Sequence, residues 1–147
     1  MHDIILLGDK KMNALFLLKS KGEVAYLIDM YTIEQGLVTM REKHYTAIPV
    51  ITHDGDYVGC ISEGDFLWHI VNPQNHARTD VPIRQIMRKD YNPAVKIDVS
   101  MEGLLERIKV QNFVPVVDDR NKFIGIITRK DVICYFQNYI EKMNEAQ

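Results

Sequence analysis

A short pattern of residues occurs twice in this chain of 147 residues, and the repeat constrains the possible folds more than any other feature. The shared residues are a Pro-Val pair, a glycine, an isoleucine, a hydroxyl residue and an aspartate. They lie at Pro49-Val50, Gly59, Ile61, Ser62 and Asp65, and again at Pro115-Val116, Gly125, Ile127, Thr128 and Asp131. Each pair is 66 positions apart. A fixed period indicates two similar units in tandem, and a cleft between such units is a natural ligand site.

The hydrophobic pattern predicts the same order of elements, β-α-β-β-α, around each copy. Strands are expected at 24–28, 45–51 and 57–61 and then at 94–97, 113–117 and 123–127, with helices after Thr32, Ser62, Ser100 and Thr128. Short helices are expected at 12–18 and 82–87. Before the repeated Pro-Val pairs the offset between the copies is larger: Ile28-Asp29 corresponds to Ile97-Asp98, 69 positions later. The first loop and helix of the second copy therefore lack three residues.

Neither copy alone is expected to have a large core. In each copy both helices are expected to cover one face of a small sheet, which leaves the other face apolar. We therefore expect an α/β (α+β) fold in which two β-α-β-β-α units pack sheet to sheet about a pseudo-twofold axis. The expected parts are an N-terminal helical segment at 1–20, a first unit at 21–72, a linker and short helix start at 73–84, a second unit at 85–141 and a C-terminal tail at 142–147.

Some apolar side chains are assigned from helical spacing. The last helix is expected to place four of them on its inner side, at Val132, Ile133, Phe136 and Ile140. Trp68 is expected in the core or at an interface. Aromatic surface left at Tyr135 and Tyr139 fits a contact between two copies of the chain, because an exposed apolar stripe often marks an interface.

Composition excludes several classes of function. The formal net charge of −2 gives no electrostatic footprint for nucleic acid and no polybasic membrane patch. The apolar runs at 4–7 and 14–18 are too short to span a bilayer. Nothing at the N-terminus resembles a signal peptide, so we expect a cytoplasmic protein. The two cysteines, Cys60 and Cys134, lie in apolar contexts and are expected to be buried, reduced thiols.

Neither a metal site nor an enzyme is expected. The five histidines lack the spacing of metal ligands, and the cysteines are isolated from one another. The chain has no P-loop, dinucleotide-binding or serine-hydrolase motif. No nucleophile–base pair accompanies the carboxylates of the repeat.

The repeated Ser62-x-x-Asp65 and Thr128-x-x-Asp131 have two interpretations. In the structural interpretation, each is a capping box that only satisfies free amides at a helix N-terminus. The same geometry suits a ligand, because a helix N-terminus attracts phosphate and a carboxylate there can accept hydrogen bonds from ribose hydroxyls. The glycines Gly59 and Gly125 in the preceding strands permit a bulge or the close approach of a ligand.

These motifs resemble the signature of a CBS domain. The resemblance rests on 125–131 with Pro115-Val116-Val117 upstream, and on 59–65 with Ile48-Pro49-Val50 upstream. It covers about residues 21–141, so the chain resembles a tandem CBS pair, or Bateman module, and above all the small stand-alone CBS-pair proteins of Firmicutes. The resemblance implies a homodimer and an adenosine-containing ligand: AMP, ADP, ATP, S-adenosylmethionine or cyclic di-AMP.

The resemblance also implies two binding sites, in which Asp131 and Asp65 accept the ribose hydroxyls. The first site comprises Lys21, Val24, Ala25, Tyr45, Thr46, Ala47, Ile48, Pro49, Thr128, Arg129, Lys130 and Asp131. The second, weaker site comprises Ser62, Asp65, Pro93, Ala94, Asn112, Phe113 and Val114.

The residues between the repeated positions predict that these sites are unequal. In the first, small Ala47 lies with the cations Arg129 and Lys130, which suits phosphate. In the second, Phe113 replaces the alanine and Glu63 lies beside the helix N-terminus. We therefore expect a narrower site that repels phosphate, although Phe113 could instead stack on a base.

The function expected from these observations is an adenine-nucleotide sensor that acts on an unidentified partner protein in trans and requires no cofactor. Cyclic di-AMP is the more specific expectation for the ligand, and AMP, ADP or ATP the more general one. Three alternatives stay open: a protein-interaction module with vestigial sites, an S-adenosylmethionine sensor, and an enzyme that uses the cleft between the units.

Overall fold

Side-chain caps begin the helices where the sequence predicts them. Thr32 and Gln35 form a reciprocal capping box at the first helix, and Ser62 and Asp65 form another. The Ser100 hydroxyl accepts a hydrogen bond from the amide of Gly103 at 3.0 Å. These bonds satisfy amides that have no partner within the helix, so the short repeated motifs fix where each helix starts.

The structure, a computed structural model, describes residues 14–146, which contain two small sheets. The sheet of the first half has the order β2-β3-β4, and that half consists of β2 (Leu27–Ile28), α2 (Ile33–Lys43), β3 (Ala47–Ile51), β4 (Tyr57–Ser62) and α3 (Glu63–Val71). The sheet of the second half has the order β1-β7-β6-β5, with β1 (Lys19–Ser20), β5 (Val95–Lys96), α4 (Met101–Ile108), β6 (Phe113–Val117), β7 (Phe123–Thr128) and α5 (Arg129–Glu145).

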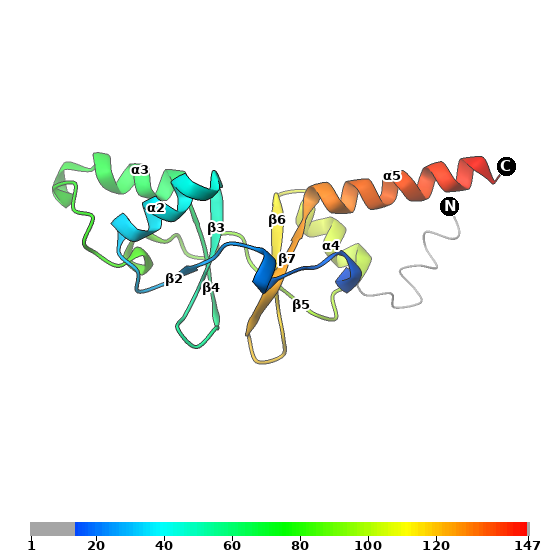
Figure 1. The fold of residues 1–147 in the computed structure, drawn as a ribbon, viewed down its shortest axis with the longest axis horizontal. Helices are drawn as coiled ribbons and strands as arrows, with labels where there is room; N and C mark the ends of the chain where they lie inside the picture. The colour runs from blue at the N-terminus through cyan, green and yellow to red at the C-terminus, as the bar shows by residue number, and fades with distance from the viewer. Residues whose placement is uncertain (1–13, 147) are drawn as a thin grey trace.

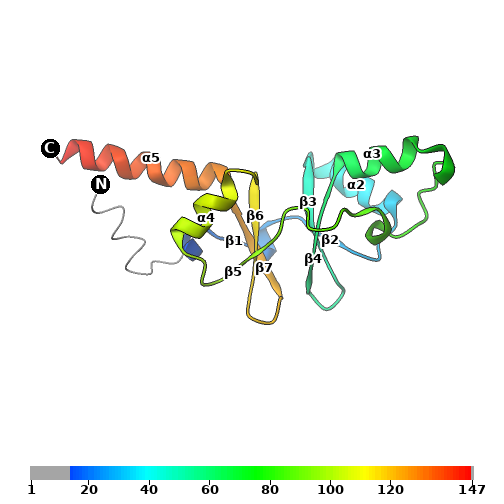
Figure 2. The same cartoon turned by 180° about the vertical axis from the view of Figure 1, so that it is seen from behind.

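The two halves repeat the same topology. In each, a short first strand is parallel to the second, which pairs antiparallel with the third. Helix α2 has 11 residues and its equivalent α4 has 8, which confirms the predicted loss of three residues. The sheets face each other and the helices lie outside (Figures 1 and 2). The predicted α+β fold with two β-α-β-β-α units packed sheet to sheet is therefore confirmed.

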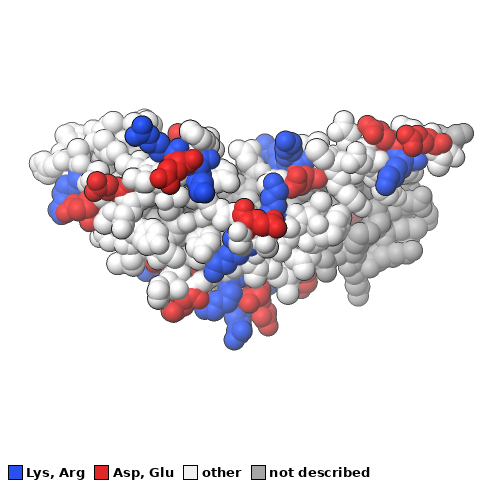
Figure 3. Space-filling model, in the orientation of Figure 1, with Lys and Arg blue, Asp and Glu red and all other residues white. Residues whose placement is uncertain are grey.

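The halves are joined most directly at the turns of their β-hairpins, which lie together at the lower end of Figure 1. The amide of Tyr57 donates to the carbonyl of Asn121 at 3.0 Å, and the amide of Phe123 donates to that of Gly55 at 2.9 Å. The Lys122 ammonium lies 2.9 Å from the Asp56 carboxylate. At the other end of the seam the surface is notched, with Lys and Arg side chains on both sides (Figure 3).

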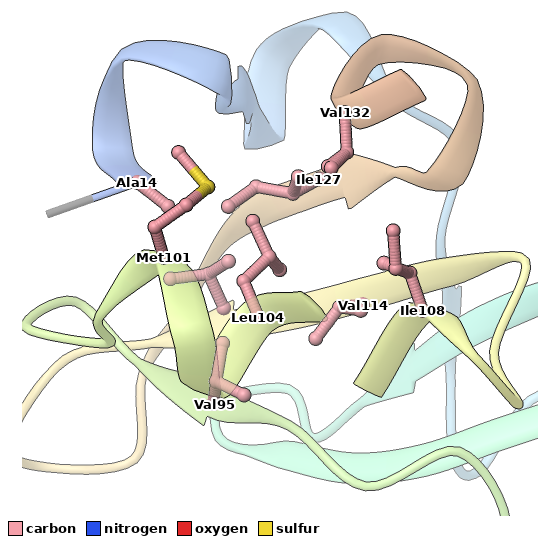
Figure 4. Packing of buried hydrophobic residues seen from close by; sticks show 9 residues of the cluster. Ala14, Val95, Met101, Leu104, Ile108, Val114, Ile127 and Val132 are labelled. Carbon is pink, nitrogen blue, oxygen red and sulfur yellow. The ribbon is translucent and has the colours of Figure 1, made fainter. Parts of the chain in front are cut away.

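Each half has its own cluster of buried side chains between its sheet and its helices. The second half buries Val95, Leu104, Val114, Ile127 and Val132, among others, under α4 and the first turns of α5 (Figure 4). The first half buries an equivalent set that includes Leu27, Ile33, Ile48, Ile61 and Phe66. Burial of such side chains stabilises each half by about 2 kcal/mol per large residue.

Both cores also contain a residue from a distant segment. Ala14, in the 3₁₀ turn η1 (Ala14–Leu17), is fully buried in the core of the second half. Ile83, in the 3₁₀ turn η4 (Ile83–Ile86), is fully buried in the core of the first half. These residues are 69 positions apart, the same offset as Ile28 and Ile97. The segment that precedes the first half therefore contributes to the core of the second half, and the segment that precedes the second half contributes to the core of the first.

As a result, two segments cross between the halves on opposite sides of the molecule. The first carries β1, which pairs with β7, and the 3₁₀ turn η2 (Lys21–Glu23), and it crosses on the near side in Figure 1. The second runs from η4 to β5 and crosses on the near side in Figure 2. The domain boundaries given above stay predictions. A division by contacts would assign η1 to the second half and η4 to the first.

Several elements differ from their predicted extent. The strands expected at 24–28 and 94–97 shrink to β2 and β5, and the helix expected at 82–87 is the 3₁₀ turn η4. Of the helix expected at 12–18, positions 12 and 13 lie outside the described residues, and Ala14–Leu17 form a 3₁₀ turn. The region 73–84, expected as a linker and short helix start, contains the 3₁₀ turn η3 (Pro73–Asn75) and the first two residues of η4.

Some burial predictions were wrong. Ile133 and Ile140 are 54% and 49% exposed. Ile133 lies in the first turns of α5 beside buried Val132, whereas the later turns, which include Ile140, extend beyond the sheet (Figure 1). Trp68 is 71% exposed, which excludes the core and leaves the alternative of an interface position as a prediction. Cys134 is exposed, whereas Cys60 is buried as predicted. Tyr135, expected on the surface, packs against Phe16 of η1 with ring centroids 4.9 Å apart.

Gly125 allows the crossing segment that carries β1 to lie close to β7. It has φ of +154°, and a Cβ there would collide with the carbonyl oxygen of Lys19 on β1. Gly125→Ala should therefore lower the free energy of unfolding by about 2 kcal/mol, as measured by chemical denaturation. Gly22→Ala is the matched control, because nothing lies within 4 Å of a Cβ at that position. Equal stability of the two variants would contradict the close approach of β1.

Candidate functional site

The strands of each hairpin bring the predicted site residues to the notched end of the seam. Ala47 pairs with Ser62, and Phe113 pairs with Thr128, so the first residue of one strand lies beside the helix cap that ends the next. The amide of Glu63 donates to the carbonyl of Thr46 at 2.9 Å, and the amide of Arg129 donates to that of Asn112 at 2.8 Å. The two helix N-termini are thus fixed in equivalent positions.

A cavity of about 440 Å³ lies between the halves at this end. That volume is within the range of small-ligand sites. Its lining combines aromatic rings, amides and hydroxyls from both halves, and consists of Tyr45, Thr46, Ala47, Ser62, Glu63, Gly64, Tyr91, Asn92, Val110, Gln111, Asn112 and Phe113. A smaller apolar slot of about 40 Å³ shares three of these residues and is lined by Val24, Ala25, Tyr45, Ala47, Ile48, Pro49, Phe113 and Ile126.

The residues predicted for the first site are only partly brought together. Val24, Ala25, Tyr45, Ala47, Ile48 and Pro49 line the slot, and Thr46 lines the larger cavity. Thr128, Arg129, Lys130 and Asp131 lie at the start of α5, and the slot reaches Ile126 on the strand that leads there. The apolar wall and the polar helix start of this site are therefore neighbours.

The cations predicted for the first site have other contacts. Arg129 Nε donates to the carbonyl oxygen of Ile108, at the C-terminal end of α4, at 2.8 Å. The Lys21 ammonium lies 5.3 Å from the centroid of the Tyr26 ring, near the hairpin turn at Gly55. Lys130 is exposed. The structure therefore does not assemble Lys21 and Arg129 into one cationic cluster.

The larger cavity adjoins residues of both predicted sites. Ser62, Asn112 and Phe113 of the second site line it together with Tyr45, Thr46 and Ala47 of the first. The expected narrowing of the second site by Phe113 stays a prediction. Phe113 is only half-buried and forms one wall of the cavity together with Asn112.

Other residues of the second predicted site serve the structure of the second half. The carbonyl of Pro93 accepts hydrogen bonds from Arg107 and Gln111, at 3.3 and 3.2 Å. Ala94 is half-buried in the same loop. The Val114 side chain lies in the core of the second half, away from the cavity.

The two aspartates of the repeat differ in their availability. The side chain of Asp65 is 5% exposed. It accepts hydrogen bonds from the amide of Ser62 at 2.8 Å and from Arg88 Nε at 2.7 Å. The side chain of Asp131 is 35% exposed, and among the described residues its carboxylate is paired only with the Lys19 ammonium, at 3.6 Å. Asp131 therefore retains acceptor positions that Asp65 has already used.

Sequence reasoning missed Arg88, Tyr91 and Lys19. Arg88 stacks 3.8 Å from the centroid of the Tyr91 ring and also donates to the Ser62 hydroxyl at 3.1 Å. Its hydrogen bond to Asp65 raises the pKa of the Arg88 guanidinium. Lys19 and Arg88 are 69 positions apart. Ile28 and Ile97 are also 69 positions apart. Applying this offset to the two crossing segments would identify Lys19 and Arg88 as equivalent residues.

A buried network holds the wall of the larger cavity in place. The Tyr57 hydroxyl donates to the carbonyl of Asn92 at 2.7 Å, and Asn92 Nδ2 donates to Cys60 Sγ at 3.3 Å. Burial raises the pKa of Tyr57, and burial raises the pKa of the Cys60 thiol to about 11. Both groups therefore stay neutral at physiological pH, and they join β4 of the first half to the loop that enters β5.

The described part of the chain offers neither a metal cluster nor a membrane span. Residues 14–146 contain no group of three His, Cys, Asp or Glu side chains that could hold a metal ion. Over the same residues, no helix has the length and apolar character needed to cross a membrane.

Comparison with known proteins decides the family. The model of the CBS domain matches the chain twice, over residues 14–72 and 83–138. The chain belongs to the CBS domain family. The two matches begin 69 positions apart, at Ala14 and Ile83, so each CBS unit includes the turn that packs in the opposite core. Uncharacterized curated relatives include one from Methanocaldococcus jannaschii that is 26% identical over 131 residues. The chain spans less than half the length of the curated relatives it matches.

Solved CBS-pair structures share the whole fold. CbpB in complex with c-di-AMP has a TM-score of 0.81 at 22% identity, over 95% of this chain and 98% of that one. CbpB of Listeria monocytogenes, also in complex with c-di-AMP, has a TM-score of 0.76 at 25% identity, over 84% and 94%. CBSX2 in complex with AMP has a TM-score of 0.72 at 21% identity, over 86% and 97%. These relatives are nucleotide-binding CBS pairs.

The two cysteines should differ in reactivity. Cys60 is fully buried with its pKa raised to about 11, so about one molecule in a thousand carries a Cys60 thiolate at pH 8. Cys134 is exposed on α5. Mass spectrometry after iodoacetamide treatment of the native protein at pH 8 should find one alkylated residue, Cys134. The denatured protein, as control, should be alkylated at both. Rapid native labelling of Cys60 would contradict the buried network.

Proposed function

We propose that this CBS pair is a regulatory module that binds an adenine nucleotide between its halves and transmits the binding to a partner protein. The observation that carries the proposal is the partly exposed carboxylate of Asp131, which keeps acceptor positions at the start of α5 beside an apolar slot. A ribose needs a carboxylate of this kind, and a base needs apolar walls.

Charge at this helix start also favours a nucleotide. The N-terminus of a 17-residue helix attracts negative charge through its free amides. Lys19 and Lys130 lie at this helix start. The Lys19 side chain is 49% exposed, so the Lys19 ammonium can move from Asp131 to a phosphate. The Thr128 hydroxyl, which accepts from the Asp131 amide at 3.1 Å, is positioned to contact the same phosphate.

The proposed ligand is an adenosine nucleotide, with cyclic di-AMP as the more specific candidate and AMP, ADP or ATP as the others. The complexes of CbpB with c-di-AMP and of CBSX2 with AMP support this class. The larger cavity and the slot share Tyr45, Ala47 and Phe113. Because these residues come from both halves and include two aromatic rings, a base stacked there would contact both CBS units.

The proposed mechanism is linkage between ligand binding and the orientation of the halves. A nucleotide that contacts both units favours the orientation in which both grip it, and this changes the affinity of the outer surface for a partner. We further propose that the protein is a cytoplasmic homodimer without catalytic activity. The apolar side chains of Val38, Leu67, Trp68 and Val71, all more than half exposed on or beside α2 and α3, support a dimer contact.

A second candidate function is protein interaction through a module whose ligand sites are vestigial. The reciprocal capping box and the Arg88 contact of Asp65 favour it for the second site, because that carboxylate is fully used by the protein itself. S-adenosylmethionine is a further candidate ligand. Thermal-shift measurements with AMP, ADP, ATP, S-adenosylmethionine and cyclic di-AMP separate these candidates, because a ligand that binds only the folded state raises the melting temperature. If none of these ligands raises the melting temperature, the result supports the vestigial module.

The two aspartates should contribute unequally to nucleotide binding. Asp131→Ala should weaken binding of the nucleotide that gives the largest thermal shift by about tenfold or more, because hydrogen bonds to a charged acceptor are lost. Asp65→Ala should have a much smaller effect, and Asp119→Ala, on an exposed turn, should have none. Isothermal titration calorimetry measures all three. Equal losses for Asp131→Ala and Asp65→Ala would contradict one dominant site.

A further inference from the structure

We propose that Lys19 and Arg88 are equivalent residues that determine which of the two clefts accepts a nucleotide. Arg88 blocks the carboxylate of the second site, whereas Lys19 leaves that of the first site accessible. This inference rests on the proposed function, because it assumes that both carboxylates are ribose acceptors.

The two cations occupy equivalent positions in the repeat. Lys19 and Arg88 are 69 positions apart, as are the buried residues Ala14 and Ile83 of the same two segments. Each cation lies on a segment that crosses between the halves, and each pairs with the repeated aspartate of the half that its segment completes. The arrangement therefore follows from the pseudo-twofold symmetry of the fold.

The contacts differ because the two side chains differ. The guanidinium of Arg88 contacts Asp65 Oδ1 at 2.7 Å and the Ser62 hydroxyl at 3.1 Å, and it stacks on Tyr91. Arginine suits such planar contacts, whereas lysine is a mobile point charge. Lys19 lies 3.6 Å from Asp131, and the position equivalent to Tyr91 is Gly22, which offers no ring.

These contacts set the cost of ligand entry. Asp65 Oδ2 already accepts two hydrogen bonds from Ser62, and Oδ1 is taken by Arg88, so ribose hydroxyls can bind only if Arg88 leaves. A charge-assisted hydrogen bond to a carboxylate that is 5% exposed is lost in that step. At Asp131 a ribose displaces only a longer contact to a half-exposed ammonium. The first site therefore fills before the second.

The test exchanges the two cations and measures AMP binding by isothermal titration calorimetry. Asp131→Ala disables the first site, and adding Arg88→Lys should make AMP binding about tenfold tighter than in Asp131→Ala alone. Asp65→Ala disables the second site, and adding Lys19→Arg should weaken binding about tenfold relative to Asp65→Ala alone. Arg78→Lys is the control, because Arg78 is in an exposed ion pair with Asp80; it should change nothing.

Unchanged affinity after either exchange would overturn the inference, and it would leave the proposed function intact as long as the wild-type protein binds AMP. A measurement without ligand tests whether Arg88 blocks Asp65 separately from whether the protein binds a nucleotide. It uses the wild-type protein, so it does not require any variant to fold. In the wild-type protein the Arg88 Nε proton should exchange with water at least about tenfold more slowly than that of exposed Arg120 in nuclear magnetic resonance spectra. Equal exchange rates would show that Arg88 does not block Asp65, whatever the protein binds.

Discussion

Each half of this molecule depends on a segment that precedes the other half. Ala14 is buried in the core of the second half and Ile83 in the core of the first. The exchange leads two segments across the seam, one on each side (Figures 1 and 2). It also brings Lys19 to Asp131 and Arg88 to Asp65. Packing of the two cores and pairing of the two repeated carboxylates therefore depend on the same two crossings.

The seam between the halves has a fixed end and an open end. Main-chain hydrogen bonds and the Lys122–Asp56 ion pair join the hairpin turns, whereas the cavity lies at the opposite end, beside the helix N-termini. A ligand at the open end would change the angle between the sheets more readily than their separation at the turns. Such a motion would be transmitted to the outer helices, where the exposed apolar side chains lie.

The amino-acid sequence predicts the repeat, the helix caps and the order of elements, because these depend on local patterns such as Thr32 with Gln35. It misplaces Ile140, since helical spacing does not show where the sheet beneath a helix ends. It identifies Asp65 and Asp131 as candidates and predicts unequal sites from their neighbours. It does not show that the two carboxylates differ in exposure, because that difference depends on Arg88 and Lys19 from distant segments. Those partners follow from the tertiary exchange, which the 69-position offset indicates only once the crossing is known.

A crystal structure of the wild-type protein with the nucleotide that gives the largest thermal shift tests the central claim most directly. The predicted result is one nucleotide whose ribose hydroxyls lie within hydrogen-bond distance of Asp131, with Lys19 moved towards the phosphate and Arg88 still on Asp65. A nucleotide bound at Asp65, with Arg88 displaced and Lys19 still paired with Asp131, would contradict it. So would a nucleotide bound outside the cleft between the two CBS units.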